Sequence, residues 1–193
     1  MVLTFVTGPL RAGKSRMAER LAMATGFAVT YVSTARPDEA DPVWRERSAE
    51  SAARRPPGWR FVESARPGAP SLEALLSLAG ERETLVIDTL VNWLAVRMSV
   101  HLGHGDAEAP PDAYALLDEG EALLAAIAAT RAHVIVVGEE IGWGAAPTYL
   151  AGHVLREVSG RLQARLATQA ERAYLVVSGH ALDLRTQGRA IER

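Results

Sequence analysis

The 193-residue sequence contains no cysteine. Disulfide bridges and thiolate metal sites are therefore excluded, and the absence fits the reducing environment of the cytoplasm. Also missing are an apolar run of membrane-spanning length and, at the N-terminus, the basic flank and long apolar stretch of a secretory signal. We therefore expect a cytoplasmic protein with no membrane partner.

A strong excess of one charge is missing as well. The chain has 21 Lys and Arg residues and 23 Asp and Glu residues, which gives a formal net charge of −2. This balance gives no reason to expect a nucleic acid as a partner, so any polyanion must bind at a local site. The chain is long enough for a full core, and no repeat, low-complexity tract or domain boundary divides it. We therefore predict a single domain over residues 1–193.

One segment, residues 8–15, has the spacing of a phosphate-binding loop. Its two glycines allow backbone turns that direct several N–H groups at an anion, next to the positive end of a helix dipole. Lys14 would bind the β and γ phosphates, and the Ser15 hydroxyl would bind the Mg²⁺ ion that bridges them. The residues predicted to hold ATP or GTP here are Gly8, Pro9, Leu10, Arg11, Ala12, Gly13, Lys14 and Ser15.

The rest of the chain indicates the fold class. A β-branched and aromatic run, residues 2–6, precedes this loop, and residues 14–25 after it have helical spacing. Strand and helix patterns then alternate along the chain, which is typical of a parallel sheet. We predict an α/β fold of the P-loop NTPase type, with a mostly parallel central sheet and helices on both faces. Further strands are expected at residues 27–32, 59–63, 84–87, 133–137 and 173–178.

Three segments fit the alternation less simply. Residues 59–63 alternate like a half-buried strand, which suits an edge strand or an antiparallel one. Residues from 179 onward look like a short extension of the last strand. Prolines bracket a charged, alanine-rich stretch between residues 36 and 57, which predicts a short surface helix. Its arginines either form a solvated amphipathic face or bind a ligand.

Asp88 ends the strand expected at residues 84–87 and is the second chemical landmark. A carboxylate in that place can hold Mg²⁺ directly or through water, or it can orient an attacking hydroxyl. Lys14, Ser15 and Asp88 are therefore the predicted catalytic residues, and Ser15 and Asp88 the predicted metal ligands. The alternative is structural, because an Asp followed by Thr89 often caps the next helix.

Other loops supply polar residues as well. Residues 33–35 follow the second strand, at an edge where ligands of such sheets bind. The loop at residues 138–147 has two acids and several glycines and is long for a simple connection. His101 and His104 stand in a glycine-rich stretch with one nearby acid and no fourth partner, which favours a solvated loop over a metal site.

These segments together resemble one family, the bifunctional adenosylcobinamide kinase/adenosylcobinamide-phosphate guanylyltransferases of cobalamin biosynthesis. The likeness covers nearly the whole chain. It includes the phosphate-binding loop with Arg11 inside it and residues 31–35, 59–63 and 88–94, in family order. The most specific part is residues 140–147, a loop with a glutamate, two glycines and a proline. Family-like residues follow it at Arg156-Glu157, Gly160, Gln163 and 174–179.

The resemblance implies two reactions on one scaffold. First, the γ-phosphoryl group of ATP or GTP passes to the aminopropanol hydroxyl of a corrinoid, adenosylcobinamide. Second, GMP from GTP is joined to that phosphate through a GMP–histidine intermediate. The family also implies a homotrimer, for which the helix from Leu150 is our candidate interface element. The further nucleotide-binding residues that it implies are Ser33, Thr34, Ala35, Ser51, Arg54, Glu63 and Asp88.

Two positions depart from the family pattern. Glu50 occupies the position of the guanylylated histidine, and the first histidine of the chain is His101. A carboxylate is a poorer nucleophile than a neutral imidazole, so Glu50 is not expected to act as one. Gln163-Ala164 replaces the usual Asn-Gln pair, which is a milder change. The hypothesis is that nucleotide binding and the kinase step are retained, while guanylyl transfer by the covalent route is lost, slowed or rerouted.

Two alternative functions stay open at this level. One is a P-loop kinase of another small alcohol, and the other is a nucleotide-binding regulatory or scaffold subunit without turnover. The presence of both Lys14 and Asp88 favours an enzyme, because the loss of either would be a sign of an inactive relative.

Overall fold

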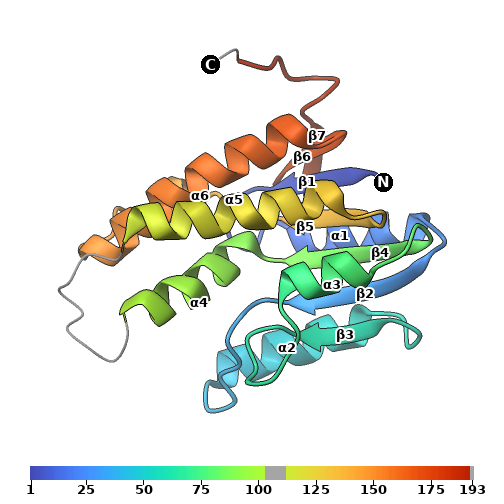
Figure 1. Ribbon diagram of the computed structural model, residues 1–193, viewed down its shortest axis with the longest axis horizontal. Helices are drawn as coiled ribbons and strands as arrows, with labels where there is room; N and C mark the ends of the chain where they lie inside the picture. Colours follow the sequence, from blue (N-terminus) through green and yellow to red (C-terminus); the bar gives the residue numbers. More distant parts are fainter. Residues whose placement is uncertain (103–111, 192–193) are drawn as a thin grey trace.

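The computed structural model describes residues 1–102 and 112–191, which form a seven-stranded sheet with helices on both faces (Figure 1). The strand order is β3-β2-β4-β5-β1-β6-β7, and all neighbours are parallel except β6 and β7. The predicted fold class is confirmed. The elements are β1 (Leu3–Thr7), α1 (Lys14–Ala24), β2 (Ala28–Ser33), α2 (Pro42–Arg54), β3 (Arg60–Glu63), α3 (Leu72–Leu78), β4 (Glu83–Asp88), α4 (Leu90–Leu102), α5 (Ala113–Ala129), β5 (His133–Val137), the 3₁₀ turn η1 (Ile141–Trp143), α6 (Leu150–Gln169), β6 (Arg172–Val177) and β7 (His180–Asp183).

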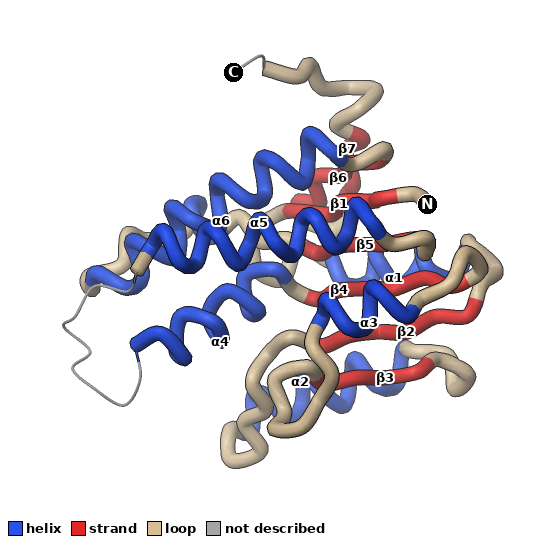
Figure 2. Tube along the Cα trace, in the orientation of Figure 1, coloured by secondary structure: helices blue, strands red, loops and turns tan. Residues whose placement is uncertain are grey.

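Alternate residues of the central strands face two separate cores. On one face, Leu3, Phe5 and Ile87 pack with apolar residues of α3, α4, α5 and α6. On the other face, Val6 and Val86 pack against α1. Figures 1 and 2 show α3 to α6 in front of the sheet and α1 and α2 behind it. The parallel strands bring their carboxyl ends to one edge, where the loops to the helices begin.

The two outer edges of the sheet correct two expectations. β3 lies at one edge, as expected, but it is parallel to β2, with Arg60 opposite Thr30, so the antiparallel alternative is wrong. The antiparallel strand is β7 at the other edge, in the region expected to be only an extension. Ser178 and Gly179 connect it to β6 with φ values of 49° and 78°, the two positive values that a type I′ hairpin turn requires.

Several helices begin at a residue whose side chain caps them, but α1 does not. The Ser71 hydroxyl accepts the N–H of Ala74 at 3.2 Å at the start of α3. Asp112 caps α5 in the same way. The residue before α1 is Gly13, which has no side chain to accept a bond. The first N–H groups of α1 are thus left for a partner outside the helix.

The helices are amphipathic rather than apolar all round. The longest, α6, has 20 residues and buries Val158, Leu162 and Leu166, as predicted from the sequence, while Arg161 is exposed. Among the helices of residues 1–102 and 112–191, none combines the length and apolar character needed to cross a bilayer.

Candidate active site

The loop from residue 8 to residue 15, here called the phosphate loop, connects β1 to α1 and is fixed by its neighbours. Gly8 has φ of 149°, and a Cβ atom there would lie 2.0 Å from the carbonyl oxygen of Val176, so only glycine fits. Gly13, with φ of 107°, turns the chain into α1. The N–H of Gly179 donates to the carbonyl of Ala12 at 3.0 Å. The loop therefore curves around the uncapped N-terminus of α1, the geometry of an anion site.

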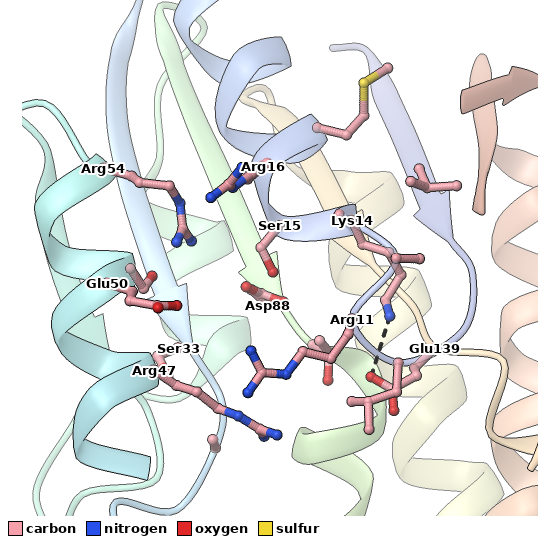
Figure 3. A pocket seen from close by; sticks show the side chains of 18 of the residues that line it. Arg11, Lys14, Ser15, Arg16, Ser33, Arg47, Glu50, Arg54, Asp88 and Glu139 are labelled. Carbon is pink, nitrogen blue, oxygen red and sulfur yellow. Dashed lines mark hydrogen bonds and ion pairs between the residues drawn. The ribbon is translucent and has the colours of Figure 1, made fainter. Parts of the chain in front are cut away.

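A pocket of about 720 Å³ opens beside the phosphate loop (Figure 3). Its other walls come from α2, from the carboxyl ends of β2, β3 and β4, from Glu139 and from the hairpin of β6 and β7. Its size suits a nucleotide. Gly8 and Pro9 are not part of the lining: Gly8 packs against the backbone of Val176, and the carbonyl of Pro9 accepts a hydrogen bond from Lys14. The predicted residues that the structure brings together here are Leu10, Arg11, Ala12, Gly13, Lys14, Ser15, Ser33, Glu50, Ala35, Ser51, Arg54, Glu63 and Asp88.

Apart from Gly8 and Pro9, two described candidate residues, Thr34 and His101, do not line this pocket. Thr34 is buried, donates its hydroxyl to the carbonyl of Thr89 at 2.6 Å, and lines a second cavity of about 340 Å³ on the other face of the sheet. His101 lies in the last turn of α4 rather than in a loop, with Nε2 2.8 Å from Glu119. His104 lies outside the described residues.

Asp88 and Ser15 point toward one another in the pocket (Figure 3). The carboxylate of Asp88 accepts the hydroxyl of the buried Tyr31. Burial, followed by the negative charge of Asp88, raises the pKa of Tyr31 far above its usual value, so this hydroxyl stays a donor. The helix-cap alternative for Asp88 is wrong, because Thr89 caps α4 by accepting the N–H of Asn92 at 3.2 Å.

The residues present fit a magnesium ion. The Ser15 hydroxyl and the Asp88 carboxylate are hard oxygen ligands that approach from two sides of the pocket. In the described part of the chain, no group of three or more His, Asp or Glu side chains is placed to form a cage for a metal. Mg²⁺ in nucleotide sites usually takes one or two protein ligands and completes its shell with phosphate and water oxygens.

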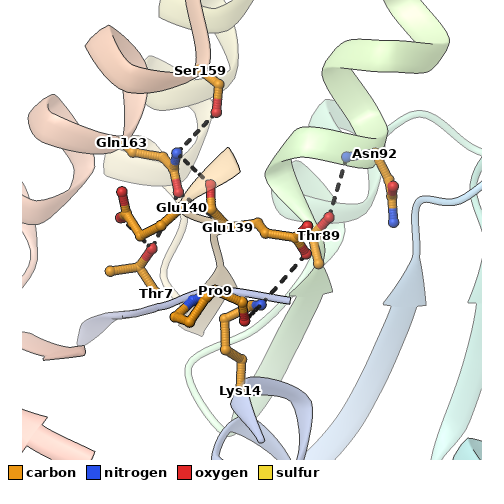
Figure 4. Close-up of polar contacts among 9 residues, drawn as sticks. All are labelled: Thr7, Pro9, Lys14, Thr89, Asn92, Glu139, Glu140, Ser159 and Gln163. Carbon is orange, nitrogen blue, oxygen red and sulfur yellow. Dashed lines mark hydrogen bonds and ion pairs between the residues drawn. The ribbon is translucent and has the colours of Figure 1, made fainter. Parts of the chain in front are cut away.

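Lys14 is almost fully buried and contacts an acid that is distant in the sequence (Figure 4). Its Nζ donates to the carbonyl of Pro9 at 2.8 Å and lies 3.4 Å from Oε2 of Glu139, which follows β5. The side chain of Gln163, from α6, binds the backbone of Glu139. The contacts of Glu139 and Gln163 cannot be predicted from the sequence, because they depend on β5 and α6 lying beside β1.

The helix α2 is exposed along its length, yet it is more than a solvated face. Arg54 forms two hydrogen bonds to the carboxylate of Glu19 in α1, at 3.0 and 3.1 Å, and these bonds raise the pKa of Arg54. The inner side of α2 belongs to the pocket wall, where basic residues outnumber acidic ones, as suits a triphosphate. The arginines that line the pocket as a whole are Arg11, Arg16, Arg20, Arg47, Arg54 and Arg55.

A cluster of three aromatic side chains, Tyr31, Trp59 and Phe61, lies beside Arg55. The sequence did not predict it as part of the site. The guanidinium of Arg55 lies 4.0 Å from the ring centre of Phe61 and 5.0 Å from that of Tyr31. Burial lowers the pKa of Arg55. Trp59 stacks on Tyr31 at 6.4 Å. The alternation of residues 59–63 indicates a strand, but it does not show that the aromatic rings gather beside the pocket.

Comparison with known families assigns the chain. A family model described as "Cobinamide kinase / cobinamide phosphate guanyltransferase" matches residues 4–184. The chain belongs to this family. It is 32% identical over 180 residues to the bifunctional adenosylcobalamin biosynthesis protein CobP of Pseudomonas aeruginosa, over 93% of this chain and 95% of CobP. It is 29% identical over 183 residues to CobU of Salmonella typhimurium, over 92% of this chain and 97% of CobU.

Solved structures are similar to this cobinamide kinase family member in fold only. An ATPase from the type III secretion system of pathogenic bacteria superposes with a TM-score of 0.54 at 10% identity. The superposition covers 98% of this chain and 59% of that ATPase. The family resemblance and the fold class predicted from the sequence are both confirmed.

Proposed function

We propose that this cobinamide kinase family member transfers the γ-phosphoryl group of ATP or GTP to the aminopropanol hydroxyl of adenosylcobinamide, a step of cobalamin biosynthesis. The observation that carries the proposal is the convergence of Lys14, Ser15 and Asp88 on one cationic pocket. An acid that faces the loop hydroxyl can hold Mg²⁺ at the phosphates, as phosphoryl transfer requires. Family membership supports cobinamide as the acceptor.

Each residue has a role that follows from its place. The backbone N–H groups of the phosphate loop and the N-terminus of α1 bind the phosphates. Lys14 neutralises charge at the β and γ phosphates, and Ser15 and Asp88 would hold Mg²⁺. The metal would supply positive charge to the phosphoryl group as it transfers. Tyr31 keeps the Asp88 carboxylate oriented through its hydrogen bond.

The second family reaction is not part of the proposal. Glu50 lines the α2 side of the pocket at the position where the resemblance implies a guanylylated histidine. Among the described residues that line the pocket, none is a histidine. A phosphoramidate cannot form on a carboxylate, so we propose that the product is adenosylcobinamide phosphate and that covalent GMP transfer is absent. The family's homotrimer is retained as a proposal, which light scattering of the purified protein tests.

The test is product analysis by mass spectrometry after incubation with adenosylcobinamide and MgATP or MgGTP. The expected product is heavier than the substrate by one phosphoryl group. Lys14→Ala should reduce turnover by about 10²–10³-fold, the usual cost of one preorganised charge-stabilising group. Arg131→Ala, at an exposed residue far from the loop, is the control. Phosphorylation only of another alcohol would favour the alternative kinase, and binding without transfer would favour the regulatory subunit.

A further inference from the structure

The turn that follows β5 is fixed directly against the phosphate loop. The N–H of Gly138 donates to the carbonyl of Val6 at 2.8 Å, and the N–H of Glu140 donates to the carbonyl of Gly8 at 3.0 Å. A Cβ atom on Gly138 would lie 2.2 Å from the side-chain oxygen of Gln163. These contacts therefore hold the backbone on either side of Glu139 in a fixed position relative to the phosphate loop.

The side chain of Gln163 completes this support (Figure 4). Its Oε1 accepts the N–H of Glu139 at 2.8 Å, and its Nε2 donates to the carbonyl of Glu139 at 3.1 Å. The same Nε2 donates to the hydroxyl of Ser159 at 2.8 Å. Gln163 is only 6% exposed, so both ends of its amide are used within the protein. A buried amide with all these bonds fixes the backbone of one residue, Glu139.

The side chain of Glu139 meanwhile faces the pocket. It is partly exposed there, and Lys14 is its one hydrogen-bond or ion-pair partner among the described residues. In a phosphate loop, the lysine binds the β and γ phosphates. An acid beside the lysine Nζ therefore lies near the γ-phosphate. Lys14 offsets the repulsion between these two anions, and the carboxylate is left able to accept the proton of a hydroxyl that approaches the γ-phosphorus.

We propose that Glu139 is the general base of the phosphoryl transfer and that Gln163 is its positioning residue; this inference rests on the proposed function. The acceptor oxygen forms a bond to the γ-phosphorus while the bond from that phosphorus to the β,γ-bridging oxygen breaks. The proton of the acceptor hydroxyl passes to the Glu139 carboxylate. The nucleoside diphosphate leaves with the electron pair of the broken bond.

The other acids near the pocket are less well placed for this role. Asp88 accepts a tyrosine hydroxyl and is the proposed metal ligand. Glu140 accepts the hydroxyl of Thr7 at 2.7 Å and does not line the pocket. Glu50 lies on the opposite side of the pocket (Figure 3), and Glu63 is ion-paired with an arginine. Glu139 is the acid nearest to the loop lysine.

The test compares Glu139→Gln with the parental protein and with Glu81→Gln, a matched control at an exposed residue. Glu139→Gln should lower kcat by about 10²–10³-fold, the usual contribution of a general base. The KM for nucleotide should change less than threefold, and the fall of kcat at acid pH should become shallower, because one fewer carboxylate takes part in the reaction. Glu139→Asp keeps the carboxylate, so it should keep that acid limb at a lower kcat. Unchanged kcat in Glu139→Gln, or an acid limb there as steep as in the parental protein, would overturn the proposal.

The dependence of kcat on pH also tests the role of Gln163. Gln163→Met has similar volume but no amide, so it should lower kcat at least tenfold and retain the acid limb. Hydrolysis of ATP, with water as the acceptor, is measured in every variant. If the parental protein phosphorylates no cobinamide, the proposed function fails, and the effect of Glu139→Gln on ATP hydrolysis still decides the role of Glu139.

Discussion

Lys14 Nζ and Glu139 Oε2 lie 3.4 Å apart, although 125 positions separate the two residues in the chain. The contact crosses from the phosphate loop after β1 to the turn after β5, two neighbouring parallel strands. It shows that the carboxyl edge of the sheet brings a charge pair to the place where phosphates would bind. The residues that surround this pair supply the following predictions.

Gly8→Ala should abolish tight nucleotide binding. The added Cβ would lie 2.0 Å from the backbone oxygen of Val176, and backbone atoms of a paired strand cannot move aside cheaply. We expect a loss of about 1–3 kcal/mol in the free energy of unfolding and a displaced phosphate loop. Calorimetric titration with MgATP and thermal unfolding measure the two effects.

Gly26→Ala is the control for this change. Gly26 also has positive φ, 68°, but nothing lies within 4 Å of its Cβ position. It should cost about 1–2 kcal/mol of stability through backbone strain and leave nucleotide affinity unchanged. Equal loss of affinity in both variants would mean that strain, not the shape of the loop, limits binding.

Asp88→Asn should raise the Mg²⁺ concentration that the enzyme needs for half-maximal turnover. The amide keeps the shape of the side chain and can still accept the hydroxyl of Tyr31, but it lacks the charge that attracts the metal. Loss of one charge-assisted contact is worth about 1.5 kcal/mol, so half-saturation should need about tenfold more Mg²⁺. Turnover titrated with Mg²⁺ measures this shift. Asp118→Asn, at an exposed position of α5, should behave like the parental protein.

The Arg97–Glu119 pair should stabilise the fold only above acid pH. Hydrogen bonds from Arg97, with a smaller one from His101, lower the pKa of Glu119. Because the folded pKa is depressed, the stabilisation is complete above the ordinary glutamate pKa of about 4.3. It is lost as pH falls through the folded value. The pair is partly exposed, so its worth is about 0.5 kcal/mol.

Thermal unfolding of Glu119→Gln tests this sign. The variant should be less stable than the parental protein at pH 7, and the difference should shrink as pH falls below about 4.3, the ordinary glutamate pKa. Glu157→Gln, which removes an exposed pair with Arg161, is the matched control. A difference in stability that grows toward acid pH would contradict the assignment.

Much of the nucleotide site could be predicted because its residues are contiguous. The phosphate loop carries its glycines, lysine and hydroxyl within eight positions, and Asp88 ends a recognisable apolar strand. Thr34 shows the limit of that approach. Successive residues at the end of a strand point to opposite faces, so Ser33 and Ala35 line the pocket while Thr34 faces the second cavity.

The contacts between distant segments could not be predicted. Alternating strand and helix patterns indicate a parallel sheet but not the order of its strands, and the position of β5 next to β1 decides which acid meets Lys14. β7 was missed because its four residues are mostly exposed and carry no apolar alternation. Its real signal was the Ser178-Gly179 dipeptide, a hairpin turn sequence.

Glu50→His should restore a covalent step. The resemblance implies a guanylylated histidine at this position, and Glu50 lines the pocket beside Ser51 and near Arg54. After incubation with α-labelled GTP and denaturing electrophoresis, we expect an acid-labile label on the variant protein. Glu46→His, on the same helix but outside the pocket lining, should stay unlabelled. No label on Glu50→His would mean that more than this one side chain has changed.

The most direct measurement uses GTP labelled at the α phosphate in one incubation and at the γ phosphate in another, each with adenosylcobinamide and the parental protein. The proposal predicts γ label in adenosylcobinamide phosphate and no α label on the denatured protein. A γ label that never reaches the corrinoid, or an acid-labile α label on the protein band, would contradict it.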